Sequence, residues 1–229
     1  MRYEILSQIG EGGVGSVHVC RDRGTGERFA IKLVKLDQPE VAASLAAEFE
    51  ILADLAHPNI VPVHDFGVEQ DQCFMVMDLI DGVDAARALS EIFNGDWHAM
   101  LARFAEVFGA LDFVHARGIV HGDLKPSNIL FDRSGKPVLV DFGMAAYYHQ
   151  QPGPRGATYR YAAPEVFEGE VGDGRSDLFS AGLILYECLT GESIQRFGAE
   201  VELDLARVPA KVAWIVERLT STDIAQRFQ

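Results

Sequence analysis

The arrangement of apolar residues changes near residue 80, and this change restricts the fold more strongly than any other feature of the chain. Before it, short runs rich in Val, Ile and Phe are bounded by turn formers such as Gly24, which is typical of antiparallel strands. Beyond it, apolar residues recur with the spacing of helices. We therefore predict an α+β fold of two lobes, with residues 1–79 mostly strands and residues 80–229 mostly helical. The strands are predicted at residues 3–9, 16–22, 28–35, 60–67 and 73–79.

One predicted helix, over residues 40–55, interrupts these strands. Its apolar residues Val41, Leu45, Leu52 and Leu55 recur at helical spacing, and Glu48 lies on the same face. The helix therefore carries a carboxylate within its apolar stripe.

The second half contains a helix beginning near Trp97 that is apolar almost all round, as a core helix is. Helices are also predicted at 177–190, ending at Gly191, and at 209–219, with a short strand at 138–140. Trp97 and Trp214 are expected in the core.

Charge and cysteine content exclude several classes of function. The chain has 20 Lys and Arg against 34 Asp and Glu, a formal net charge of −14, which repels nucleic acid and anionic membranes. No apolar run approaches the roughly 20 residues that cross a bilayer, and no apolar secretion signal follows Met1, so we expect no membrane segment and a cytoplasmic location. The three cysteines are scattered and are expected as buried free thiols: Cys20, Cys73 and Cys188.

A glycine-rich segment lies between the first two predicted strands. Residues 10–17 fit the pattern G-x-G-x-x-G-x-V, in which glycines let backbone N–H groups approach phosphate. An ordinary hairpin turn would look similar. A dinucleotide-binding turn would be followed by a helix, whereas here a strand follows, so the segment is typical of a phosphate-covering flap between strands.

Lys32 lies in the predicted strand 28–35 and shares a face with Ala30. A strand lysine is often an exposed edge charge. Here, however, the inward Glu48 needs a cation to offset its burial. Paired with Glu48, the Lys32 ammonium would be held toward an anionic ligand.

The strongest cluster of polar residues lies between 121 and 141. Asp123 can accept a hydroxyl proton, Lys125 can neutralise a transferring phosphoryl group, and Asn128 with Asp141 can hold Mg²⁺ through oxygen ligands. Singly, such residues also cap turns. In this order, and with Lys32 and Glu48, the combination points to phosphoryl transfer.

With these motifs, and with His57-Pro58-Asn59, Ala163-Pro164-Glu165 and Asp177-Leu178-Phe179, the chain resembles the eukaryotic-like serine/threonine protein kinases over nearly its whole length. The resemblance implies that residues 1–229 form one bilobal kinase domain. It also implies ATP with Mg²⁺, or Mn²⁺, as cofactors and proteins as substrates.

The resemblance also implies the roles of individual residues. Asp123, Lys125, Lys32 and Glu48 would be catalytic, Asn128 and Asp141 would bind the metal, and Thr158 would position the substrate. Met77 would be the gatekeeper, and Asp78, Leu79 and Ile80 the hinge. Leu52, Val63, His121 and Phe142 would stack between the lobes, with Asp177 beneath the catalytic loop. The implied nucleotide-binding residues are Ile9, Gly10, Glu11, Gly12, Gly13, Val14, Gly15, Ser16, Val17, Ala30, Lys32, Met77, Asp78, Leu79, Ile80 and Leu130.

Some positions depart from the family pattern. Gly122 stands where many members have an Arg that receives an activation-segment phosphate, so we predict activity without such phosphorylation. Phe179 replaces the usual Trp. Asp223 and Arg227 resemble the start of the last helix, which would be cut short at Gln229, and Arg227 would pair with Glu165.

Two other functions share part of this pattern. A pseudokinase would use the same fold only to bind a partner, but every catalytic residue type is present. A small-molecule phosphotransferase is suggested by His-Gly-Asp-Leu at 121–124. The segment from Thr158 to Glu165 argues against it, since such enzymes lack this platform for protein substrates.

Overall fold

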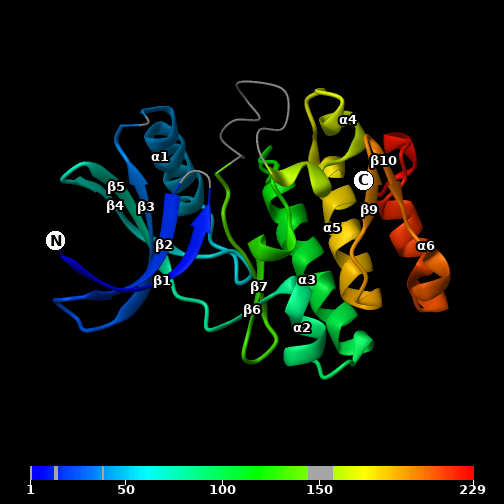
Figure 1. Cartoon of the computed structure of the whole chain (residues 1–229), viewed down its shortest axis with the longest axis horizontal. Coiled ribbons are helices and arrows are strands. Elements are labelled where there is room, and N and C mark those ends of the chain that lie inside the picture. The colour runs from blue at the N-terminus through cyan, green and yellow to red at the C-terminus, as the bar shows by residue number, and fades with distance from the viewer. Residues whose placement is uncertain (1, 13–14, 38, 144–156) are drawn as a thin grey trace.

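The computed structural model describes residues 2–12, 15–37, 39–143 and 157–229, with the backbone alone at Gly12, Ala157 and Thr158. It consists of two lobes, as predicted. Figure 1 shows the strands β1–β5 and helix α1 at one end and the longer helices at the other. Within the described residues, no helix is both long and apolar enough to span a bilayer.

The small lobe is built on a five-stranded antiparallel sheet with the order β1-β2-β3-β5-β4. All five predicted strands are confirmed, and most ends lie within two residues of the predicted ones. The strands are β1 (Tyr3–Gly12), β2 (Gly15–Asp22), β3 (Arg28–Lys35), β4 (Val63–Glu69) and β5 (Gln72–Asp78).

The fourth strand begins at Val63 rather than at residue 60. Ile60 instead forms an isolated parallel bridge with Leu139, and the Val61 N–H donates to the Leu139 carbonyl at 3.0 Å. Both side chains are buried, Ile60 at 2% and Val61 at 1% exposure. The segment before β4 therefore belongs to the core of the large lobe, although its sequence is that of a strand.

Helix α1 (Pro39–Ala53) packs against β3, β4 and β5. Its buried face consists of Ala42, Leu45, Glu48 and Leu52, so the carboxylate does lie in the apolar stripe. Glu48 is only 1% exposed.

The large lobe is mainly helical. Helix α3 (Trp97–His115) buries Phe104, Val107 and Leu111 completely, as its apolar pattern predicted. The 177–190 helix begins earlier, at Gly174, because Asp173 and Ser176 form a capping box there. The other helices are α2 (Ala85–Glu91), α4 (Pro164–Phe167), α5 (Gly174–Thr190) and α6 (Ala210–Leu219).

Short strands complete this lobe. They are β6 (Gly82–Asp84), β7 (Ile129–Asp132) and β8 (Pro137–Leu139), which form one sheet, and the hairpin β9 (Gln195–Phe197) and β10 (Glu200–Glu202). Short 3₁₀ helices lie at Pro126–Asn128, Ala157–Arg160, Leu205–Arg207 and Ile224–Gln226.

One core prediction is wrong. Trp214 is 55% exposed, because Val212, Val216 and Leu219 form the buried face of α6 and Trp214 lies on the other side, near the Phe228 ring. Trp97 is partly buried against the core. Cys20, Cys73 and Cys188 are buried and free, as predicted.

Candidate active site

A cavity of about 440 Å³ lies between the lobes. Its walls come from β1, β2, β3 and β5 on one side and from the segments 125–130 and 140–141 on the other. The predicted residues that line it are Ile9, Gly10, Glu11, Gly15, Val17, Ala30, Lys32, Glu48, Met77, Asp78, Leu79, Ile80, Lys125, Asn128, Leu130 and Asp141. Sequence reasoning missed Gly82, Val83, Asp84, Arg87, Ser127 and Val140, which also line it.

A few predicted nucleotide-binding residues lie elsewhere or are not described. Ser16 is in β2, opposite Leu33, and its Oγ lies 2.9 Å from the His18 Nε2 rather than lining the cavity. Gly12 ends β1. Gly13 and Val14 lie outside the described residues.

Lys32 connects the two lobes at the inner end of this cavity. Its Nζ donates to the Glu48 Oε2 at 2.7 Å and to the Asp141 Oδ1 at 2.8 Å. The predicted pairing with Glu48 is confirmed, and one ammonium also reaches a carboxylate that is 109 residues away in the chain. Lys32 thus connects its own strand, β3, with α1 through Glu48 and with the segment after β8 through Asp141.

Burial and charge oppose each other within this group. Burial alone would lower the pKa of Lys32, but the two carboxylates outweigh it and raise that pKa. Burial has the opposite effect on an acid and would raise the pKa of Asp141, yet the Lys32 ammonium and its hydrogen bond lower that pKa to about 2. For Glu48, burial prevails over Lys32 and raises the pKa. Asp141 therefore remains ionised at neutral pH, paired with the Lys32 ammonium.

Asp123 and Lys125 lie together on the loop that leads into the 3₁₀ helix Pro126–Asn128. The Lys125 Nζ is 2.6 Å from the Asp123 Oδ2, and the Asn128 Nδ2 donates to the Asp123 carbonyl at 2.9 Å. Asn128 closes the 3₁₀ helix that Pro126 begins, where proline fits the first helical position. The structure thus brings Asp123, Lys125 and Asn128 together, as the sequence predicted, although Asp123 is not among the residues that line the cavity.

Asp177, at the start of α5, supports this loop from below. Its Oδ2 accepts the His121 backbone N–H at 2.8 Å and its Oδ1 accepts that of Gly122 at 2.9 Å. The His115 Nε2 also lies 2.8 Å from the Oδ2. The sequence did not predict a role for His115. Its only indication was the position of this polar residue at the end of a core helix.

One contact of the predicted stack between the lobes is present. The rings of His121 and Phe142 lie 4.5 Å apart, centroid to centroid. Leu52, His121 and Phe142 are buried, and Val63 is partly buried against the same core.

The predicted pair of Glu165 and Arg227 is confirmed. The Arg227 Nη1 donates to the Glu165 Oε1 at 2.7 Å and the Nη2 to the Oε2 at 2.8 Å, while Arg227 is completely buried. The expected start of a last helix is a single 3₁₀ turn after Asp223, and Arg227 follows it with extended backbone.

Thr158, the predicted substrate-positioning residue, has its backbone in the 3₁₀ helix Ala157–Arg160, and its side chain is not among the described ones. The residues that follow it are firmly held. The Tyr161 hydroxyl donates to the Glu187 Oε2 at 2.7 Å, and the Ser180 Oγ donates to the Tyr161 carbonyl at 2.7 Å.

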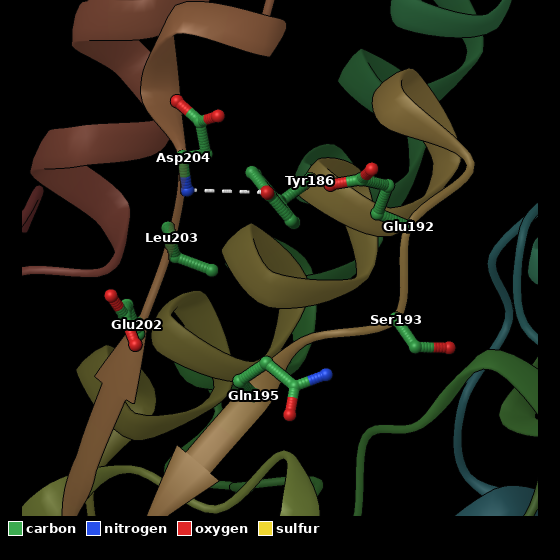
Figure 2. Close-up of a pocket in the computed structure, with 7 residues that line it drawn as sticks. All are labelled: Tyr186, Glu192, Ser193, Gln195, Glu202, Leu203 and Asp204. Atoms are coloured by element: carbon green, nitrogen blue, oxygen red, sulfur yellow. Dashed lines mark hydrogen bonds between the residues drawn. The ribbon is translucent and has the colours of Figure 1, made fainter.

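A second cavity, of about 720 Å³, contains none of the predicted site residues. Figure 2 shows the carboxylates of Glu192, Glu202 and Asp204 around it, with the Asp204 N–H donating to the Tyr186 hydroxyl. Arg207 pairs with both Glu192 and Asp204. Two of these three carboxylates therefore already have a partner. Lys32, Lys125, Asn128 and Asp141, which were predicted to bind phosphate or metal, line the smaller cavity instead.

The metal that the resemblance implies can be tested against the donor set. Asn128 and Asp141 both line the smaller cavity and offer an amide and a carboxylate oxygen, which are hard ligands suited to Mg²⁺. Asp141 has φ of 65°, a conformation that aspartate tolerates better than most residues. The residues present fit the ion.

Comparison with known proteins agrees with this geometry. The protein kinase domain family matches residues 3–223. The chain is 32% identical over 248 residues to the serine/threonine-protein kinase PknD of Mycobacterium tuberculosis (strain CDC 1551 / Oshkosh), covering 99% of the chain and 37% of that protein. It is 29% identical over 249 residues to the probable serine/threonine-protein kinase PknB of Lactococcus lactis, covering 99% of the chain and 40% of that protein.

A third relative is the serine/threonine-protein kinase PknJ of Mycobacterium bovis, 35% identical over 208 residues, with 86% of the chain and 35% of that protein covered. The chain thus spans well under half the length of these relatives. The match to the family nevertheless extends from β1 to Asp223, just before the last 3₁₀ helix, and includes every element around the smaller cavity. The chain therefore belongs to the protein kinase domain family, and its bacterial relatives are serine/threonine kinases.

Proposed function

We propose that this chain is an ATP- and Mg²⁺-dependent kinase that phosphorylates Ser and Thr hydroxyls of proteins. The observation that carries the proposal is the Lys32 bridge between Glu48 and Asp141, at a cavity that Lys125 and Asn128 also line. Two cations and two oxygen-bearing side chains face one space there. This is the arrangement that phosphoryl transfer requires, because catalysis consists of positioning and charge neutralisation.

In this proposal, Asp123 orients the acceptor hydroxyl and takes its proton while the hydroxyl oxygen bonds to the γ-phosphorus of ATP and the bond to the ADP oxygen breaks. Lys125 and Lys32 balance the charge of the transferring group and of the remaining phosphates. Asn128 and Asp141 would hold Mg²⁺, which neutralises phosphate charge when bound. Lys125 would have to exchange part of its present contact with Asp123 for phosphate.

The adenine end of the cavity is the apolar one. Val17, Ala30 and Leu130 line it from both lobes, and Met77 is buried at its back. Backbone groups of residues 78–80, at the end of β5 and just after it, would pair with the base. Asp84 and Arg87 line the same cavity on the large lobe, where polar groups of the nucleotide would meet solvent.

The direct test is Asp123→Ala. We expect phosphate transfer from radiolabelled ATP to a mixture of histone H1 and casein to fall by at least about a hundredfold, since a positioned base contributes about that much or more. The melting temperature should change little. Asp81→Ala is the matched control, because Asp81 is an exposed aspartate whose pairing with Arg133 lies outside the cavity. Wild-type transfer by Asp123→Ala would contradict the assigned base.

The same assay separates the alternative functions. A pseudokinase would bind nucleotide without turnover, whereas a small-molecule phosphotransferase would act on an aminoglycoside or choline and not on protein. A panel containing both kinds of acceptor therefore decides among the three.

We further propose that activity does not depend on phosphorylation of the 144–162 segment. Gly122 offers only its backbone N–H, which is donated to Asp177, so position 122 supplies no guanidinium to bind a phosphate. Protein treated with phosphatase should keep its full initial rate. If the rate collapses and returns after autophosphorylation, this part of the proposal is wrong.

A further inference from the structure

The hairpin of β9 and β10 directs one arginine away from its own strands. Gly198, with φ of 63°, turns the hairpin, and Ile194 before it is buried in the core of the large lobe. From β9, the Arg196 Nη1 donates to the carbonyls of Ala162 at 2.6 Å and Arg160 at 3.2 Å. An arginine of the hairpin thus binds the backbone just before Ala163-Pro164-Glu165.

The remaining contacts of Arg196 fix its guanidinium in this place. The Nε donates to the Gly198 carbonyl at 2.8 Å, and the guanidinium lies over the Phe167 ring, 4.5 Å from its centroid. In the described part of the chain, its hydrogen-bond partners are carbonyl oxygens, and burial lowers its pKa. The planar guanidinium donates several hydrogen bonds in fixed directions and also stacks on an aromatic ring, and a lysine ammonium cannot replace it in both respects.

The backbone that Arg196 holds is part of the surface expected to face a protein substrate. It begins two residues after Thr158, and its side chains are fixed by Glu187, which binds the Tyr161 hydroxyl at 2.7 Å and the Arg160 Nη2 at 3.1 Å. The same Glu187 carboxylate accepts the Ile194 N–H at 2.9 Å. Residues 160–162 are therefore held from two sides: Arg196 of the hairpin binds their backbone, and Glu187 of α5 binds their side chains.

We propose that Arg196 is a positioning residue for the protein substrate, acting through the backbone of Arg160–Ala162. This inference rests on the proposed kinase function. It assigns to the hairpin a role in setting the shape of the acceptor platform, and none in nucleotide binding, because neither β9 nor β10 contributes to the smaller cavity.

The test compares Arg196→Ala and Arg196→Lys with the wild-type chain, with histone H1 as acceptor. We expect Arg196→Ala to raise the KM for histone H1 by about tenfold, because residues 160–162 would no longer be pre-organised and the substrate would have to order them on binding. Arg196→Lys should lie nearer to Arg196→Ala than to wild type, since lysine cannot make the fork. The KM for ATP and the melting temperature in the presence of ATP should stay within twofold and about 3 °C of wild type. The matched control is Arg207→Ala, an arginine that pairs with Glu192 and Asp204 instead.

Each outcome decides the matter. A merely structural arginine would shift the melting temperature and both KM values together, and that result would overturn the proposal. If the wild type phosphorylates histone H1 and Arg196→Ala leaves its KM unchanged, this inference alone fails. If the wild type transfers no phosphate to any protein although it binds ATP, the proposed function fails and this inference with it.

Discussion

Lys32 is surrounded by groups that depend on it. One oxygen of Glu48 is paired with Lys32, and its other oxygen, Oε1, is buried without a hydrogen-bond partner among the described residues. A carboxylate so nearly desolvated is tolerated only with a cation beside it. The ammonium that is proposed to act on phosphate is therefore also structural.

We predict that Lys32→Met lowers the free energy of unfolding by about 3 kcal/mol at pH 7, because it leaves a buried carboxylate unpaired. Adding Glu48→Gln should restore part of this loss. In the single variant Lys32→Met, which keeps Glu48, the pKa of Glu48 should be even higher than in the wild type. The folded state would then bind more protons than the unfolded state, so the free energy of unfolding should rise as the pH falls from 7 to 5. Urea denaturation measures all three effects.

The control for this series is Lys35→Met, which removes the exposed lysine at the end of the same strand. Lys35→Met should leave the free energy of unfolding unchanged. Strict additivity of Lys32→Met and Glu48→Gln would contradict the coupling.

A second buried pair, Glu165 with Arg227, gives a prediction about acid stability. Burial would raise the pKa of Glu165, but the Arg227 guanidinium outweighs it and lowers that pKa below its ordinary value of 4.5. A carboxylate with a lowered folded-state pKa stabilises above its unfolded pKa, and that contribution is lost as the pH falls through the folded one. Arg227→Met should thus cost about 3–5 kcal/mol at pH 7 and less at pH 3.

Denaturation curves at several pH values between 7 and 3 test this. Arg133→Ala, which breaks the exposed pair with Asp81 at 3.3 Å, should have no measurable effect at any of them. A loss in Arg227→Met that stays constant with pH would show that Glu165 does not titrate as proposed.

The packing of α6 on α5 depends on a glycine. A Cβ at Gly182 would lie 2.6 Å from the Leu219 Cβ and 3.0 Å from the Thr220 Cγ2. The helices therefore approach more closely there than any larger residue allows. Since Asp177 lies on the same α5 and holds the catalytic loop, this contact also supports the site.

We predict that Gly182→Ala destabilises the chain by about 1–3 kcal/mol, the cost of overpacking. The matched control is Gly109→Ala on α3, where an added Cβ meets nothing within 4 Å. That change should stabilise by about 0.5–1 kcal/mol through helix propensity. Thermal denaturation compares the stability of Gly182→Ala with that of Gly109→Ala. Equal changes in the two variants would show that α5 and α6 do not approach closely at Gly182.

The sequence predicted long elements better than short ones. The five strands and α1, α3, α5 and α6 have a clear period, so they were found. The strands β6, β9 and β10 have only three residues each, too few for a period, and are fixed by tertiary contacts such as the approach of Gly82 to the Phe131 carbonyl, 1.9 Å from where a Cβ would be.

The same distinction holds at the site. Glu48 and Lys32 could be paired in advance, because a carboxylate in an apolar stripe needs a cation. His115 and Arg196 could not be assigned, since the first meets Asp177 62 positions away and the second meets Ala162 34 positions away. Nothing local in either stretch indicates those partners.

The candidate nucleotide site is shared between the lobes, so ligand binding should stabilise both lobes together. With MgATP at a hundred times its Kd, the gain should be about 2.7 kcal/mol. For a chain of this size, that gain corresponds to roughly 5–10 °C in Tm. ATP with EDTA should give a smaller shift.

Asp141→Asn should remove the difference between MgATP and ATP with EDTA, since the amide keeps the shape and loses the charge. Asp112→Asn, at an exposed position of α3, should keep the difference. Scanning calorimetry provides the measurement. A wild-type shift that is the same with and without Mg²⁺ would refute the assignment of Asp141 to the metal.

The bridge between Ile60 and Leu139 has a consequence for dissecting this chain. Asn59 and Val61 exchange backbone hydrogen bonds with Leu139, so the polypeptide enters the large lobe once before it crosses through residues 78–80. A fragment ending at Leu79 would carry Ile60 and Val61 without the strand that shields them. Two apolar side chains would then meet water, and such a fragment should self-associate instead of folding as an independent unit.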